Sequence, residues 1–65
     1  MDGFGHEEHP WIGQQVRDIA CKGEGVLTAV VREKVTGGRF VRRAYIKPAS
    51  GIEWSTHPDN VQLVR

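Results

Sequence analysis

The stretch that most constrains the fold is a run of β-branched residues followed by two glycines. Residues 26–35 are rich in valine, which suits a pleated strand far better than a helix. Gly37-Gly38 comes next, and both central positions of a type I′ turn require the positive φ that glycine adopts freely. We therefore expect an antiparallel hairpin with a two-residue turn, in which residues 26–35 pair with residues 39–48.

The two-residue turn sets a register, and the register sorts side chains onto two faces. A slip by one residue, to a three-residue loop, would place Lys34 against Phe40 and Val31 against Arg43. That register would mix charge into the apolar face, so the two-residue turn is the expected one. One face then holds the pairs Val35–Phe40, Glu33–Arg42, Val31–Ala44 and Ala29–Ile46, and the other holds Thr36–Arg39, Lys34–Val41, Arg32–Arg43 and Val30–Tyr45.

A second hairpin is expected directly after the first. A three-residue loop at residues 49–51, with Gly51 left-handed, joins residues 39–48 to a strand over residues 52–56. This loop places Trp54 on the apolar face and gives Lys47 an opposite charge. The expected pairs are Pro48–Ile52, Lys47–Glu53, Ile46–Trp54 and Ala44–Thr56.

Shorter strands are expected on both sides of these hairpins. Residues 13–18 predict a first strand, and residues 61–64 predict a last strand after a turn of 3₁₀ helix within residues 56–60. A chain of 65 residues is too small for two packed sheets. The expected fold class is therefore all-β, a small five-stranded antiparallel barrel over residues 11–65 with little helix.

The first ten residues differ in composition from the remainder. They mix glycine, histidine and acids without periodicity, and they contain three acidic side chains and no Lys or Arg. The remaining chain carries nine basic and five acidic side chains, although the formal net charge of the whole is only +1. We expect a flexible acidic arm over residues 1–10 in front of a basic domain over residues 11–65.

Neither catalysis nor a cofactor is expected. Ser50 and Ser55 lack the context of a nucleophile elbow, and Gly23-Glu24-Gly25 is too short for a phosphate-binding loop. The order His6-Glu7-Glu8-His9 differs from the His-Glu-x-x-His zinc pattern, and Pro10 argues against a helix there. A solvated arm is the expected interpretation, and no metal site is predicted.

The single cysteine, Cys21, excludes an intrachain disulfide and fits a reducing compartment. The N-terminus carries acids and no apolar run, so a signal peptide is not expected. No stretch approaches the ~20 apolar residues that a membrane-spanning helix needs. A cytoplasmic location without membrane contact is the resulting expectation.

Three segments carry a family resemblance. Residues 13–18 (GQQVRD) followed by residues 22–27 (KGEGVL) look like a first strand, a glycine-bearing loop and the entry to a second strand. Residues 58–64 (PDNVQLV) look like a 3₁₀ turn and a final strand. In these segments the chain resembles the SH3-like small barrels, particularly the KOW and Tudor-like group, and residues 48–54 (PASGIEW) are similar to segments in short actinobacterial proteins. The resemblance implies binding of nucleic acid, of ribosomal or transcription machinery, or of protein peptides.

The face opposite the apolar one collects cations. Arg32 and Arg43 are expected directly opposite each other, which is unfavourable unless an anion sits between them. Lys34 and Arg39 lengthen the strip, and Tyr45 offers a ring on which a base can stack. These five residues predict a phosphate-dominated contact with DNA, RNA or a nucleoprotein. The alternative is a solvated outer face whose long side chains splay apart.

A second functional hypothesis is a protein-interaction module. Trp11 and Ile12 precede the first predicted strand, and with Tyr45 they could form an exposed apolar patch. The alternative for Trp11 is that it covers one open end of the barrel and completes the core. A free strand edge is another way to bind a partner or a second copy of the chain. The sequence does not determine the oligomeric state.

Overall fold

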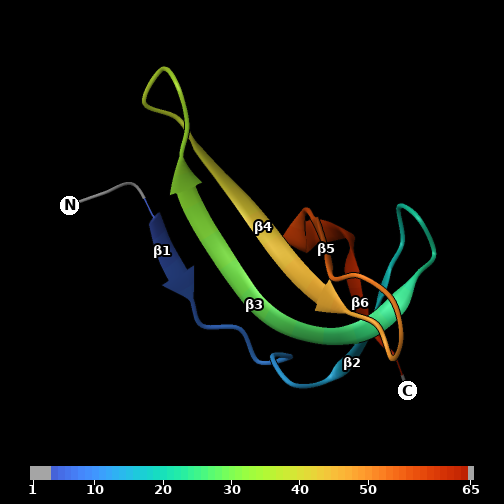
Figure 1. Cartoon of the computed structure of the whole chain (residues 1–65). Helices are drawn as coiled ribbons and strands as arrows, with labels where there is room; N and C mark the ends of the chain where they lie inside the picture. Colours follow the sequence, from blue (N-terminus) through green and yellow to red (C-terminus); the bar gives the residue numbers. More distant parts are fainter. Residues whose placement is uncertain (1–3, 65) are drawn as a thin grey trace.

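A computed structural model describes residues 4–64, which form a six-stranded antiparallel sheet (Figure 1). The strand order is β5-β4-β3-β2-β6, and β1 pairs with β3 beside this path. The elements are β1 (Phe4–Glu7), β2 (Gln15–Asp18), β3 (Glu24–Lys34), β4 (Phe40–Lys47), β5 (Trp54–Thr56), the 3₁₀ turn η1 (Pro58–Asn60) and β6 (Val61–Leu63). The all-β expectation is confirmed, and no α-helix occurs among these residues.

The sheet is open and has six strands, so the expected five-stranded barrel is not closed. Within residues 4–64, β5 pairs only with β4 and β6 pairs only with β2, and these two end strands do not pair with each other. Each is three residues long, which leaves little ladder with which to close a barrel. Closure therefore fails at the two shortest strands of the core.

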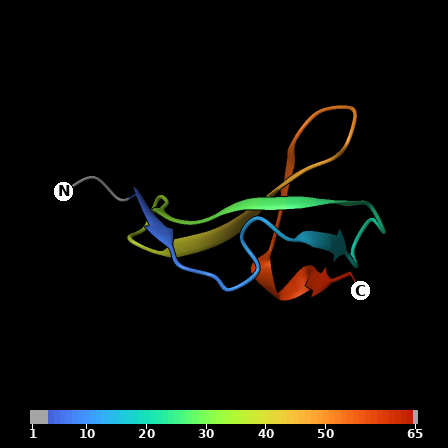
Figure 2. The same ribbon diagram turned by 90° about the horizontal axis from the view of Figure 1, so that it is seen from below.

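The long strand β3 bends and connects two parts of the molecule. β4 follows it along one edge, while β2 covers the beginning of the other edge and β1 covers its far part. The far halves of β3 and β4 form a ribbon that projects away from β2 and β6 (Figures 1 and 2). The strand β1 occupies part of the segment expected to be a flexible arm, and residues 1–3 of that arm lie outside the described residues.

The register of the first hairpin differs from the predicted one by one residue. Lys34 pairs with Phe40 and Val30 with Ala44, around a three-residue loop over residues 36–38. Gly37 and Gly38 both have the positive φ that was expected of them, but the loop has one residue more. All side chains of the far half of β3 therefore exchange faces relative to the prediction.

A β-bulge at Thr28 makes this register compatible with the core. The ladder shifts between Leu27 and Ala29, so Leu27 and Val30 both face inward although three positions separate them. The hydroxyl of Thr28 donates to a carboxylate oxygen of Glu53 at 2.7 Å. Glu53 is thus engaged by Thr28, and the predicted Lys47–Glu53 pair is absent from the ion pairs of residues 4–64.

The register of the second hairpin is confirmed. Ile46 pairs with Trp54 and Ala44 pairs with Thr56, and Gly51 has the expected positive φ. Trp54 packs against the core cluster, as its predicted position beside Ile46 requires. Trp11, Trp54 and Leu63 surround a buried core that consists of Val16, Leu27, Val30, Ala44, Ile46 and Val61.

One buried carboxylate lies beside this apolar cluster. Asp18 is 2% exposed and accepts hydrogen bonds from the indole Nε1 of Trp54 at 2.9 Å and the backbone N–H of Ala20 at 2.9 Å. The hydroxyl of Thr56 at 3.2 Å and the thiol of Cys21 at 3.4 Å complete the set. Burial favours the neutral acid, but the four donors together hold the pKa of Asp18 below its ordinary value. Asp18 therefore ties β2 to β5 and to the turn that follows β2.

Stability should fall in acid because of this carboxylate. In the unfolded chain, the Asp18 carboxylate binds a proton near pH 3.9. In the folded chain, Asp18 stays ionised to a lower pH. The stabilisation is therefore present above about pH 4 and is lost as the pH falls through the lowered folded pKa. We expect the urea midpoint to decrease between pH 5 and pH 3, with a smaller decrease in Asp18→Asn. An unchanged midpoint over this range would contradict the assignment.

Candidate nucleic-acid interface

The five predicted site residues do not share one face. Because the register is shifted, Arg32 and Lys34 lie on the same face as the core residue Val30. The β4 residues Arg43 and Tyr45 lie on the opposite face, and Arg39 has the same parity. The predicted single basic face, with Arg32 opposite Arg43, is therefore wrong.

The core-side face continues beyond the core as a cationic surface. We call it the ribbon face and define it as Arg32, Lys34, Phe40 and Arg42. The guanidinium carbon of Arg32 lies 5.2 Å from the centroid of the Phe40 ring, and Phe40 is 55% exposed. Phe40, which was expected to be an apolar core-side residue, is the exposed aromatic ring of this surface. Its position next to Arg32 follows from the Lys34–Phe40 register.

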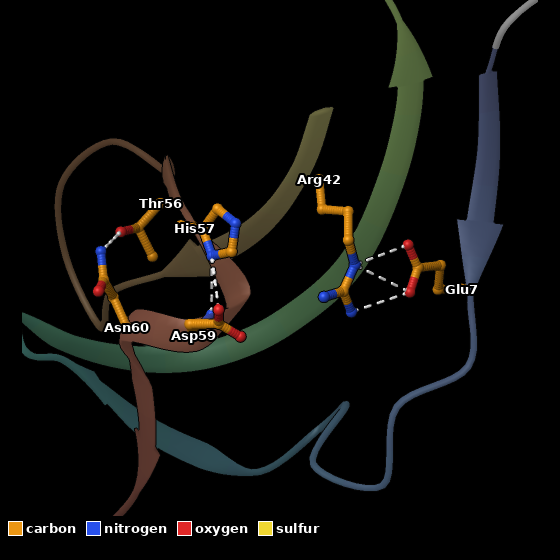
Figure 3. Close-up of polar contacts among 6 residues, drawn as sticks. All are labelled: Glu7, Arg42, Thr56, His57, Asp59 and Asn60. Atoms are coloured by element: carbon orange, nitrogen blue, oxygen red, sulfur yellow. Dashed lines mark hydrogen bonds and ion pairs between the residues drawn. The ribbon is translucent and has the colours of Figure 1, made fainter. Parts of the chain in front are cut away.

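Arg32 is directly opposite Arg42 in the β3–β4 ladder. Two arginines in such a pair repel each other unless an anion compensates them. Glu7 of β1 supplies that anion, because its carboxylate accepts three hydrogen bonds from the Arg42 guanidinium (Figure 3). The distances are 3.2 and 3.0 Å from Nε to the two carboxylate oxygens and 3.0 Å from Nη2 to Oε1.

These contacts change the proton affinities of both partners. The hydrogen bonds from Arg42 lower the pKa of Glu7, and the charge of Arg32 lowers it further. The hydrogen bonds to Glu7 raise the pKa of Arg42. Glu7 is therefore ionised at neutral pH and lies under the influence of both arginines. The sequence analysis paired Arg42 with Glu33 and missed the contact between Arg42 and Glu7.

The opposite face of the ribbon is closer to neutral. The Nε of Arg43 lies 2.8 Å from a carboxylate oxygen of Glu33, and this contact raises the pKa of Arg43. Tyr45 is half-buried on the same face. Arg43 therefore forms an ion pair within the chain, and Tyr45 lies on the opposite face from Arg32 and Lys34.

Three of the predicted cations lack an acid partner within residues 4–64. Arg32, Lys34 and Arg39 take part in none of the four ion pairs found there. All three lie at the far end of the ribbon, around the loop at residues 36–38. We call Arg32, Lys34, Arg39 and Phe40 the ribbon tip.

Of the three residues of the alternative apolar patch, only Ile12 is exposed, while Trp11 and Tyr45 are half-buried. Trp11 is half-buried against the core, and its ring meets the ring of His9 edge-on at 5.3 Å between centroids. Ile12 is 40% exposed beside it, whereas Tyr45 lies on β4. Trp11 therefore behaves as the core-completing residue that was the alternative for it.

The polar groups around η1 stabilise the turn itself. The Nδ1 of His57 accepts from the backbone N–H of Asp59 at 3.1 Å and lies 3.6 Å from its carboxylate (Figure 3). Asn60 donates to the hydroxyl of Thr56 at 3.3 Å. Across residues 4–64, no three His, Cys, Asp or Glu side chains come together as metal ligands. Cys21 is exposed, and its thiol donates to Asp18.

Comparisons with known proteins identify no relative. No family model matches the chain, and neither a curated protein nor a solved structure matches it. None of the described residues forms a helix with the length and apolar character needed to cross a membrane.

Proposed function

We propose that this protein is a non-catalytic binding module that contacts nucleic acid through the ribbon tip. The observation that carries the proposal is a group of three cations that have no acid partner within residues 4–64, Arg32, Lys34 and Arg39, beside an exposed aromatic ring, Phe40. Cations of this kind bind phosphates by releasing condensed counterions. An exposed ring adds stacking or apolar contact with a base.

The shape of the ribbon supports the same proposal. The major groove of B-DNA admits a two-stranded β-ribbon. Among the described residues β1 pairs with β3 no further than Glu33, so the end of the ribbon consists of β3, β4 and their loop. The tip projects from the core and carries Arg32 and Lys34 on one face and Arg39 on the other. Cations on opposite faces therefore suit a groove better than a flat surface. Duplex DNA is the expected ligand, with single strands and RNA as the comparison.

The fold supports an SH3-like assignment, which we propose together with the function. The segments that carry the family resemblance coincide with β2, with the glycine-bearing loop and the start of β3, and with η1 and β6. The open sheet and the additional strand β1 are the differences from the expected barrel.

The proposal is tested by titrating labelled 20-mer duplex DNA, single-stranded DNA and RNA with the full chain at increasing salt. Binding should weaken steeply with salt, and the triple variant Arg32→Gln/Lys34→Gln/Arg39→Gln should lose about ten-fold in affinity. Its salt slope should decrease by about 0.9 per lost phosphate contact on duplex DNA. Phe40→Ala should weaken binding with little change in this slope.

The matched control is Arg17→Gln/Lys22→Gln/Lys47→Gln, which removes the same net charge away from the tip. It should bind nearly as well as the original chain. Equal losses in both triple variants would overturn the tip as the site. No binding to any of the ligands at low salt would overturn nucleic-acid contact as the function.

A second candidate function is peptide binding by strand addition. β5 pairs with β4 only over Ala44–Thr56 to Ile46–Trp54, so the outer edge of β4 from Phe40 to Arg43 has no partner strand within residues 4–64. The alternation of the ladder directs the backbone groups of Phe40 and Arg42 toward this edge. An extended acidic peptide complements the arginines there. Addition of poly-glutamate should then shift the amide NMR signals of Phe40 and Arg42, and unchanged signals would reject this candidate.

A further inference from the structure

We infer that Arg42 is a further phosphate-binding residue of the ribbon face, and that Glu7 occupies it in the free protein in place of a phosphate group. The inference rests on the proposed nucleic-acid function. It adds an arginine that sequence analysis did not assign to the site, and it makes β1 a built-in competitor of the ligand.

The Arg32–Arg42 pair is the first observation behind this inference. Two guanidinium groups that are directly opposite in a ladder form a site for an anion. Glu7 reaches this site from β1, on the far side of β3, where it pairs with Val30. Its two carboxylate oxygens face the Arg42 fork in the way that two oxygens of a phosphate do.

The contact is accessible enough to exchange. The side chains of Glu7 and Arg42 are 27% and 40% exposed, so a ligand on the ribbon face reaches the ion pair without opening the core. Exposed ion pairs of this kind contribute little to stability. Replacement of the carboxylate by a phosphate therefore exchanges one anion for another on the same guanidinium.

The strand that carries Glu7 is also weakly attached. β1 has four residues and pairs with β3 along one edge only, without another strand partner among residues 4–64. At Gly5 a side chain would meet nothing within 4 Å, so no packing covers this position. The charge of Glu7 is thus held near Arg42 by a short ladder and by the ion pair itself.

The consequence is that Glu7 weakens binding in the free protein. A ligand that engages Arg42 must first displace the carboxylate, so the ribbon face offers fewer available cations than its sequence contains. Neutralising Glu7 should make Arg42 available. We expect Glu7→Gln to raise affinity for duplex DNA several-fold and to steepen the salt slope by about 0.9, the value for one added phosphate contact.

The control removes an acid from an ion pair away from the ribbon. Glu24→Gln releases Arg17 and changes the net charge by the same amount as Glu7→Gln. It should raise affinity less than Glu7→Gln. The double variant Glu7→Gln/Arg42→Gln should lose the gain of Glu7→Gln. Equal affinities for Glu7→Gln and Glu24→Gln would overturn the inference.

The outcomes separate this inference from the proposed function. If the original chain and Glu7→Gln both fail to bind at low salt, the proposed function fails. If the original chain binds but Glu7→Gln raises affinity no more than its control does, only the inference fails. If a variant folds poorly, the original chain can be measured in its place. The Arg42 Nε–H NMR signal of the original chain should shift when duplex DNA is added. An unchanged signal in the saturated complex would overturn the role of Arg42.

Discussion

Replacing Asp18 with alanine should lower the free energy of unfolding by about 3 kcal/mol, which is most of the stability expected of a chain of this size. The substitution removes the acceptor of four hydrogen bonds and leaves the indole N–H of Trp54 and the N–H of Ala20 without partners. These donors are partly buried, and such a donor without a partner costs more than an ordinary hydrogen bond contributes. Urea unfolding followed by tryptophan fluorescence measures the effect.

Two variants show whether the carboxylate itself is responsible. Asp18→Asn keeps one acceptor oxygen and the side-chain volume, so it should lose less stability than Asp18→Ala. Asp59→Ala removes an acid from η1 whose side chain is 82% exposed, and it should change the free energy of unfolding only slightly. A similar loss for Asp18→Ala and Asp59→Ala would contradict a central structural role for Asp18.

Replacing Gly25 with alanine should lower the free energy of unfolding by about 2 kcal/mol because of overpacking. Gly25 is buried in β3 where this strand approaches β4. A Cβ atom there would lie 2.5 Å from the carbonyl oxygen of Lys47 and 2.8 Å from Cγ2 of Ile46. Both the backbone of β4 and a core side chain would have to move. Thermal unfolding measured by circular dichroism should show a lower Tm.

Gly5→Ala is the matched control for this substitution. Gly5 also lies in a strand, but a Cβ at this position meets nothing within 4 Å. Its Tm should therefore stay close to that of the original chain. Equal shifts for the two variants would show that loss of glycine in a strand, and not the close approach to Lys47, determines the stability.

The two hairpins show what local sequence predicts and what it misses. The register of the second hairpin followed from Gly51 and from the apolar positions of Ile46 and Trp54, because its loop and the core impose the same pairing. In the first hairpin the two-glycine turn suggested the wrong loop length. The apolar pattern did not correct it, since the bulge at Thr28 shifts the alternation of β3 by one position.

This single shift explains the errors in the candidate site. The face of each β4 residue relative to the core was predicted correctly, whereas Arg32 and Lys34 of β3 exchanged faces. The requirement that charge stay out of the apolar face was applied to the whole ribbon. It holds only where the core exists, around Val30 and Ala44, and the far half of the ribbon projects beyond it.

Two structural residues were missed for different reasons. Asp18 alternates with Val16 and so occupies a core-facing position of a strand, which is a signal that period-two analysis can detect. The acids of residues 4–10 gave no such signal. Glu7 contacts Arg42 across the strand β3, and the two residues are 35 positions apart in the sequence. The strand β1 forms only because β3 offers it an edge.

The end of the hairpin is independent of the core in one useful respect. Side chains alternate between the faces by parity, so inserting two residues in each strand between Lys34 and Phe40, past the core residues Val30 and Ala44, leaves every existing side chain on its original side. The hairpin end is therefore an attachment point where recognition loops from other proteins can be transplanted at different lengths. The apolar cluster beneath it would retain its packing.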